Sequence, residues 1–101
     1  MTSKTIDELT ELMHNFVRSK GWYEADSKRQ QSPRNLSISL ALEAAEILEH
    51  FQWNDEFVRE DLAEELADVA LYLLQLASIA EVDLEQAILG KLEVNASRNW
   101  D

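Results

Sequence analysis

The stretch LALEAAEILEHFQW, residues 40–53, places two carboxylates inside an otherwise apolar helical pattern. On a helix that turns by about 100° per residue, Ser39, Glu43, Glu46 and His50 share a strip only about 60° wide. Most of the remaining circumference is Ile, Leu, Ala and Phe, and a helix that is apolar nearly all round is a buried one. We therefore expect the acidic strip to lie between buried apolar flanks and not on a broad solvated face.

The helical spacing of apolar residues continues along the chain and predicts an all-α fold. With two Gly and one Pro, the 101 residues have little of the turn chemistry that a β-sheet needs. Four helices are expected, over residues 6–20, 33–52, 56–80 and 84–98. The length predicts one domain over residues 1–101, folded as a four-helix bundle. Because hydrophobic residues make up 46% of a chain this short, we expect oligomerisation to complete the bundle.

Residues that favour helix ends stand at the predicted boundaries. The N-terminal ones are Thr5 with Glu8 in capping-box spacing, Ser32 before Pro33, Asp55, and Asp83 with Gln86. Gly21 is suited to end the first helix. Residues 22–32 are polar and are predicted to form a loop between the first two helices.

Charge and composition exclude several classes of protein. The formal net charge of −11 opposes binding to nucleic-acid polymers or anionic membranes, since both require Lys and Arg to neutralise phosphate. The chain has no Cys, so disulfides and Cys-based zinc sites are excluded. The polar start MTSKTIDELTEL is unlike a signal peptide, and no apolar run approaches the roughly 20 residues of a membrane span. We expect a soluble cytoplasmic protein.

A second acidic pair lies on the predicted third helix. Glu65 and Asp68 are i, i+3 neighbours, and Tyr72 continues the same edge one turn later. The core face of this helix is expected to consist of Leu62, Leu66, Val69, Leu73, Leu76 and Ala80. Glu46 and Glu65 are 19 residues apart, which allows an antiparallel hairpin to bring EAAE and ELAD face to face.

Four converging carboxylates repel one another and must be neutralised. Between Asn35 and Gly90 the sequence has 13 acidic residues and a single basic one, Arg59. A Mg²⁺ ion, which prefers oxygen ligands, is therefore the expected cofactor, and such a site suits phosphate-ester or anhydride chemistry. A solvated acidic face is one alternative. A di-iron site is another, but it requires Glu-x-x-His on two helices, and His50 follows Glu46 by four residues.

Two segments, SPRNLSISLALEAAEILEHFQW at 32–53 and EELADVALYLL at 64–74, resemble the MazG-like all-α nucleoside triphosphate pyrophosphohydrolases. The resemblance is to the small single-domain members, those of the dCTP-pyrophosphatase type. The family motif, Glu-x-x-Glu followed by Glu-x-x-Asp, corresponds to Glu43, Glu46, Glu65 and Asp68. The resemblance implies that these four residues are catalytic and bind Mg²⁺, and that a (d)NTP is hydrolysed to (d)NMP and pyrophosphate. It also implies a role in removing modified or excess dNTPs, and homodimers or homotetramers with shared sites.

The resemblance also implies that aromatic residues contact the base. His14 and Trp22 resemble a His and a Trp that face the base in the dCTP-pyrophosphatase type, although one residue fewer separates them here. Trp53 matches a second base-pocket Trp, and stacking on its ring would give affinity for any base. Core packing is the alternative role for all three side chains.

Polar residues on two further helices are candidates for contact with phosphate. Tyr72 lies one turn beyond Asp68, so its hydroxyl is placed to meet a phosphate. The last helix carries Lys91, Asn95 and Arg98 on one face, as a clamp for phosphate or base, or simply as charges that complement the helix dipole. Arg34, in the first turn of the second helix, is a further candidate.

The sequence departs from its apparent relatives on the base side of the pocket. Gln31 stands where those relatives often have His, and the loop from Trp22 to Ser32 is longer and more polar. Base preference is therefore open, and the sequence leaves two other functions as alternatives. One is a phosphoribosyl-ATP pyrophosphohydrolase-like enzyme, which the aromatic residues disfavour. The other is a non-enzymatic acidic interaction module, in which Glu43 and Glu46 would be exposed.

Overall fold

A computed structural model describes residues 3–100, and its secondary structure consists of four helices. They are α1 (Ile6–Ser19), α2 (Pro33–Glu49), α3 (Arg59–Ile79) and α4 (Leu84–Ser97). No strand occurs within residues 3–100, which confirms the all-α prediction. Residues 1, 2 and 101 of the predicted domain lie outside the described part of the chain.

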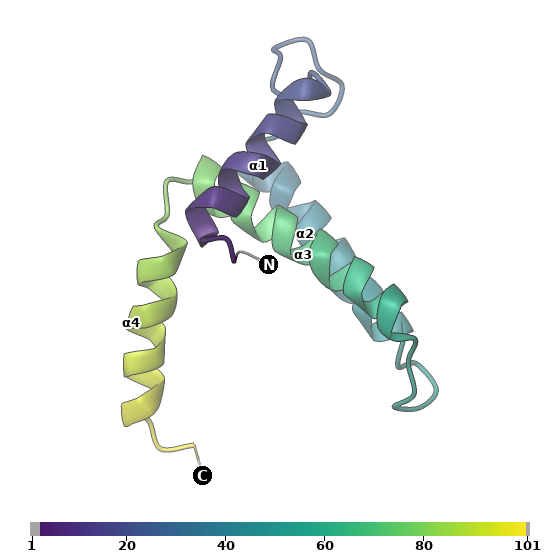
Figure 1. Ribbon diagram of the computed structural model, residues 1–101, viewed down its shortest axis with the longest axis vertical. Helices are drawn as coiled ribbons and strands as arrows, with labels where there is room; N and C mark the ends of the chain where they lie inside the picture. Colours follow the sequence, from purple (N-terminus) through teal and green to yellow (C-terminus); the bar gives the residue numbers. More distant parts are fainter. Residues whose placement is uncertain (1–2, 101) are drawn as a thin grey trace.

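The helices form a hairpin crossed by a third helix. α2 and α3 run antiparallel, side by side, and α1 lies across their upper end in Figure 1, where it packs against α3. α4 leaves the end of α3 through a short turn and projects away from the other three helices. The hairpin predicted to bring the two acidic pairs together is therefore present, whereas α4 is not packed into a bundle within one chain.

Local sequence explains most of the helix ends. The Thr5 side chain accepts a hydrogen bond from the Glu8 backbone N–H at 3.1 Å, and Glu8 Oε1 accepts one from the Thr5 N–H at 2.9 Å, which confirms the capping box. Gly21, with φ of 72°, ends α1 in a Schellman motif, in which Trp22 N–H donates to the Val17 carbonyl. The Ser32 and Asp83 side chains cap α2 and α4 as predicted.

Two predicted boundaries in the hairpin turn are wrong. α2 ends at Glu49, because the backbone N–H groups of His50 and Phe51 bond carbonyls three residues back and tighten the chain into a turn. α3 begins at Arg59, and its N-cap is Val58 in an extended conformation, not Asp55. The Phe57 ring packs on the Phe51 ring at 5.5 Å, which holds the segment before α3 against the end of α2 in a non-helical path.

The core is small and lies where α1 crosses the hairpin. Its apolar members are Met13 and Val17 of α1, Leu36 of α2 and Ala77 of α3. The predicted core face of α3 is wrong for the single chain, since none of its six residues is fully buried, and α2 buries only Leu36. One chain supplies a neighbour to only part of each helix surface, so the remaining apolar residues face solvent. Within residues 3–100, no helix has both the length and the apolar character needed to cross a bilayer.

Candidate active site

Three glutamates meet between α2 and α3. One carboxylate oxygen each from Glu43, Glu46 and Glu65 lies within 4.8 Å of the other two. Glu43 and Glu46 sit on adjacent turns of α2, and the antiparallel course of α3 places Glu65 opposite them. Glu43 and Glu65 are half-buried, whereas Glu46 is exposed. Asp68 lies one turn further along α3 and is exposed.

Burial and mutual repulsion make the charged forms of these acids costly. The pKa of Glu43 is raised to about 7, first by burial and then by hydrogen bonding to Glu46 and the charges of Glu46, Asp68 and Glu65. The pKa of Glu65 is raised by burial and by the charges of Glu46 and Asp68. All four residues of the predicted motif therefore interact electrostatically, as groups that share one site do.

The donor set of this cluster fits a hard divalent cation. Glu43 Oε2 and Glu65 Oε2 are buried and have no hydrogen-bond partner. Buried carboxylate oxygens without partners are costly, and a cation that takes only oxygen ligands would satisfy them. The arrangement can therefore hold Mg²⁺ through Glu43, Glu46 and Glu65, with Asp68 near enough to add its charge.

The pKa of Glu43 predicts that metal-free protein becomes more stable as the pH falls. Between the ordinary value of 4.5 and about 7, the folded chain binds more protons at Glu43 than the unfolded chain does, so the free energy of unfolding rises from pH 7 toward pH 4.5. Glu65 acts in the same direction. His14, whose pKa is lowered by burial, acts in the opposite direction below pH 6.5. Urea unfolding from pH 8 to pH 5 without metal measures the net effect.

Glu43→Gln isolates the contribution of that carboxyl to the pH dependence. This variant should lose most of the rise in unfolding free energy toward low pH, because Gln does not titrate. Saturating Mg²⁺ should suppress the rise in the wild type, since the metal binds the deprotonated carboxylates. An unfolding free energy that falls from pH 7 to pH 5 in the wild type and in Glu43→Gln alike would contradict the raised pKa.

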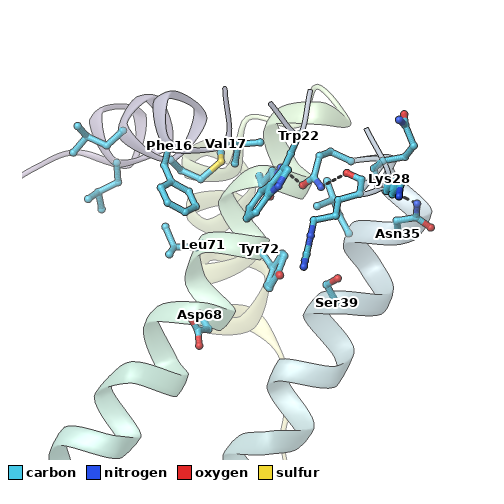
Figure 2. A pocket seen from close by; sticks show the side chains of 17 residues that line it. Phe16, Val17, Trp22, Lys28, Asn35, Ser39, Asp68, Leu71 and Tyr72 are labelled. Carbon is cyan, nitrogen blue, oxygen red and sulfur yellow. Dashed lines mark hydrogen bonds between the residues drawn. The ribbon is translucent and has the colours of Figure 1, made fainter. Parts of the chain in front are cut away.

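A cavity of about 550 Å³ opens beside the acidic cluster. Figure 2 shows Asp68 and Tyr72 of α3 on one side and Ser39 and Asn35 of α2 on the other, with Trp22 across the top. Its apolar wall comes from α1 and α3, with Phe16, Val17 and Leu71 among the residues. Its polar wall is the loop segment Lys28–Gln31. The cavity thus joins an aromatic and apolar chamber to the carboxylates.

Two of the predicted substrate-binding residues line this cavity. Trp22 is held edge-on against Phe16, with 5.7 Å between ring centroids, and the guanidinium of Arg29 lies over the Trp22 ring at 5.4 Å. Tyr72 lies between Trp22 and Asp68 (Figure 2), which places it between the chamber and the acidic cluster. His14 does not line the cavity: it is half-buried, with Nδ1 2.6 Å from the Tyr23 hydroxyl and Nε2 2.7 Å from Ser78 Oγ.

The remaining predicted substrate-binding residues lie away from the cavity of their own chain. Arg34 is exposed in the first turn of α2, and Trp53 is 86% exposed in the turn after α2. Lys91, Asn95 and Arg98 belong to α4 and its C-cap. The Arg98 guanidinium lies over the Trp100 ring at 4.2 Å, so it already has a stacking partner in the single chain.

Sequence reasoning missed the polar residues that line the upper part of the cavity. Gln75 is 3% exposed and is hydrogen-bonded to both Tyr23 and Gln31. A signal for it was available, because it is the one strongly polar residue within the run LYLLQLA of α3. Asn35 donates a hydrogen bond to the Gln30 carbonyl at 3.0 Å, which ties the loop to the start of α2.

Comparison with known proteins identifies the family. The sequence model of the MazG-like family matches residues 38–100, a segment that contains all four acidic residues of the motif. The chain belongs to the MazG-like family. The resemblance inferred from the sequence is thereby confirmed, and the matched segment includes most of α2 and all of α3, the two helices that hold the carboxylates.

Curated relatives of this MazG-like chain include dCTP pyrophosphatase 1 from Mus musculus and from Homo sapiens. Each is 33% identical over 93% of the chain and 58% of the relative, so the chain spans a little over half the length of these proteins. A solved structure of a pyrophosphatase from Archaeoglobus fulgidus DSM 4304 superposes with a TM-score of 0.81. It is 30% identical, and the match covers 100% of this chain and 97% of that one. The fold of the chain over its whole length is thus similar to that of a solved pyrophosphatase.

Proposed function

We propose that this MazG-like chain is a Mg²⁺-dependent pyrophosphohydrolase that converts a (d)NTP and water to a (d)NMP and pyrophosphate. The observation that carries the proposal is the meeting of three glutamates within 4.8 Å, with two buried oxygens lacking partners, beside a cavity lined by Trp22 and Tyr72. The names of the relatives, dCTP pyrophosphatase 1 and an archaeal pyrophosphatase, support the same activity.

In the proposed mechanism the carboxylates bind the metal ion, and the cavity binds the base. When bound, Mg²⁺ would neutralise charge on the triphosphate and lower the pKa of an attacking water. Glu43, Glu46, Glu65 and Asp68 would hold it, and one of these carboxylates takes the proton from the water that cleaves the α–β anhydride. Trp22 would offer a ring face to the base. Tyr72 lies between Trp22 and Asp68 in Figure 2, so its hydroxyl would meet the phosphates.

The proposed role is the removal of modified or excess dNTPs from the nucleotide pool, in the cytoplasm. Hydrolysis at the α–β bond suits this role, because it returns the nucleotide as a monophosphate that polymerases cannot use. This part of the proposal is supported by family membership and by the relatives named as dCTP pyrophosphatases.

We further propose that the active form is a homodimer or homotetramer. Large apolar side chains are exposed on α4, including Leu89, Leu92 and Val94, and Trp53 is 86% exposed at the far end of the hairpin. Exposed apolar surface on this scale favours association. A second copy would cover it and would bring Trp53, Lys91, Asn95 and Arg98 to a neighbouring cavity. Sedimentation velocity should give a mass of two or four chains, and a monomer at micromolar concentration would contradict the assembly.

Pyrophosphate release from a nucleotide panel tests the activity. The panel contains the four common dNTPs, several base-modified dNTPs and phosphoribosyl-ATP, each with Mg²⁺. We expect release from at least one dNTP and little from phosphoribosyl-ATP, since the aromatic lining of the cavity favours the dNTP. Release from phosphoribosyl-ATP alone would favour the sister enzyme, and release from none would contradict the proposed function.

A further inference from the structure

A chain of hydrogen bonds runs from the loop into the cavity wall. The Gln31 amide nitrogen donates to the Arg29 backbone carbonyl at 2.5 Å. The Gln75 amide nitrogen donates to Gln31 Oε1 at 2.8 Å and to the Tyr23 hydroxyl at 3.3 Å. The Tyr23 hydroxyl oxygen lies 2.6 Å from His14 Nδ1. We call these five residues the glutamine relay.

The relay fixes which way each amide points. A backbone carbonyl can only accept a hydrogen bond, so Gln31 must turn its nitrogen to Arg29 and its oxygen to Gln75. Gln75 must then present its nitrogen to Gln31. Turning the Gln75 amide over would set two carbonyl oxygens against each other at 2.8 Å, in a place where polar groups are nearly dry.

The hydrogen bonds at the Tyr23 and His14 end of the relay require the same orientation of the Gln75 amide. The Tyr23 hydroxyl accepts from Gln75, so its single proton is available for His14 Nδ1, and His14 Nε2–H then donates to Ser78 Oγ at 2.7 Å. Burial lowers the pKa of His14, which favours the neutral imidazole that this pattern requires. Both hydrogen bonds that the structure gives the Gln75 amide therefore use its nitrogen.

The Gln75 carbonyl oxygen thus accepts neither of the two hydrogen bonds that hold its amide. Gln75 is 3% exposed and lines the cavity, so its carbonyl oxygen is the remaining polar group that it can offer to a ligand there. Trp22, the ring proposed to stack on the base, lines the same cavity. A base in this cavity would meet one hydrogen-bond acceptor whose orientation is already set by the relay before the nucleotide binds.

We propose that Gln75 selects the base of the nucleotide by accepting a hydrogen bond from an exocyclic amino group, so that cytosine- or adenine-type bases are preferred over uracil and hypoxanthine. Cytosine and adenine carry an amino group, which donates a hydrogen bond, at the position where uracil and hypoxanthine carry a carbonyl oxygen. A second oxygen facing Gln75 Oε1 would leave two acceptors unpaired and desolvated. Gln31 is the positioning residue, since it acts through Gln75. This inference rests on the proposed function, which supplies the nucleotide.

Binding of non-hydrolysable analogues tests the inference separately from turnover. Calorimetric titration with Mg²⁺ compares the α,β-imido forms of dCTP and dUTP, and of dATP and dITP. We expect the full-length protein to bind the amino member of each pair roughly tenfold more tightly. Gln75→Leu should bring the ratio near one, through weaker binding of the amino member.

Two substitutions at Gln31 separate positioning from structure. Gln31→Met removes the acceptor that fixes Gln75, so the amino preference should fall toward one while both analogues still bind. Gln31→Glu keeps an acceptor facing Gln75 but loses the donor to the Arg29 carbonyl, so the preference should fall less than in Gln31→Met, even if the added charge weakens both analogues. Gln86→Ala is the matched control, because Gln86 is exposed on α4 and does not line the cavity, and it should leave the ratio of the two affinities unchanged.

The inference is overturned if the wild-type ratio is near one or inverted, if neither analogue binds, or if Gln75→Leu keeps the preference. It is also overturned if Gln31→Met and Gln31→Glu leave the same ratio. Pyrophosphate release together with an analogue affinity ratio near one would overturn this inference but leave the proposed activity standing. Amino-selective binding without any hydrolysis defeats the proposed activity and leaves the inference standing.

Discussion

Replacing Glu46 with Gln and Asp68 with Asn in one chain should lower Mg²⁺-dependent pyrophosphate release by at least about a hundredfold. The two substitutions remove two of the four charges that would hold the cation, and a metal ion in such a site contributes several kcal/mol to the transition state. Each 1.36 kcal/mol corresponds to about a factor of ten in rate. The loss should appear in kcat and persist at high nucleotide concentration.

The same variant should retain its fold and lose none of its metal-free stability. Glu46 and Asp68 are exposed, and their charges are among the causes that raise the pKa values of Glu43 and Glu65. Removing them relieves repulsion, so the melting temperature without metal should be unchanged or higher. Glu49→Gln with Glu60→Gln is the matched control, with equal charge change on exposed positions of α2 and near the start of α3. Wild-type turnover by Glu46→Gln with Asp68→Asn would show that the site is assigned wrongly.

Mg²⁺ with a non-hydrolysable triphosphate should raise the melting temperature by an amount on the order of 10 °C. A ligand at about 100 times its Kd adds roughly 2.7 kcal/mol to the stability of the folded state. For a domain of about 100 residues, each kcal/mol shifts the melting temperature by several degrees. Mg²⁺ alone should give a smaller rise, because it would satisfy the buried Glu43 and Glu65 oxygens but would leave the cavity unfilled.

Differential scanning calorimetry at constant protein concentration measures these shifts, with EDTA as the metal-free reference. Concentration must be held fixed because an oligomer melts at a temperature that depends on it. The Glu46→Gln with Asp68→Asn variant should lose most of the rise. An acidic interaction module predicts no change at millimolar Mg²⁺ with the analogue, and that outcome would favour it over the pyrophosphohydrolase.

Much of the fold follows from local sequence. Thr5 with Glu8, Ser32 before Pro33, and Asp83 cap their helices because short polar side chains satisfy the first free N–H groups wherever a helix starts. The end of α2 and the start of α3 depend instead on the Phe51–Phe57 contact and on an extended Val58. Tertiary contacts of this kind override local preference, which is why Asp55 was the wrong cap.

The acidic cluster could be predicted because helical spacing and hairpin length fix it together. Glu43 and Glu46 share a face, and the residues between Glu46 and Glu65 are enough for one antiparallel turn. The cavity could not be predicted, since its polar wall belongs to the loop at 28–31. The sequence of a loop lacks the regular spacing of apolar residues from which a helix is predicted. Gln75 is a single amide in an apolar run, and only the folded loop shows what it faces.

The apolar pattern of α2, α3 and α4 predicted a burial that the single chain does not provide. Leu42 and Leu48 of α2 are 62% and 69% exposed, and none of the residues of α4 is buried. A hydrophobic pattern predicts that a surface is buried, but it does not indicate whether the same chain or another copy covers that surface. Trp53 and Lys91 therefore remain predictions that depend on the proposed assembly.

Product analysis by ³¹P NMR shows which phosphoanhydride bond is cleaved and whether cleavage requires Mg²⁺. With Mg²⁺ and the dNTP that the panel finds most reactive, we expect a monophosphate and pyrophosphate in equal amounts, no reaction in EDTA, and recovery when excess Mg²⁺ is restored. A diphosphate with inorganic phosphate, or hydrolysis that continues in EDTA, would contradict a carboxylate-held Mg²⁺ site that directs water to the α–β anhydride.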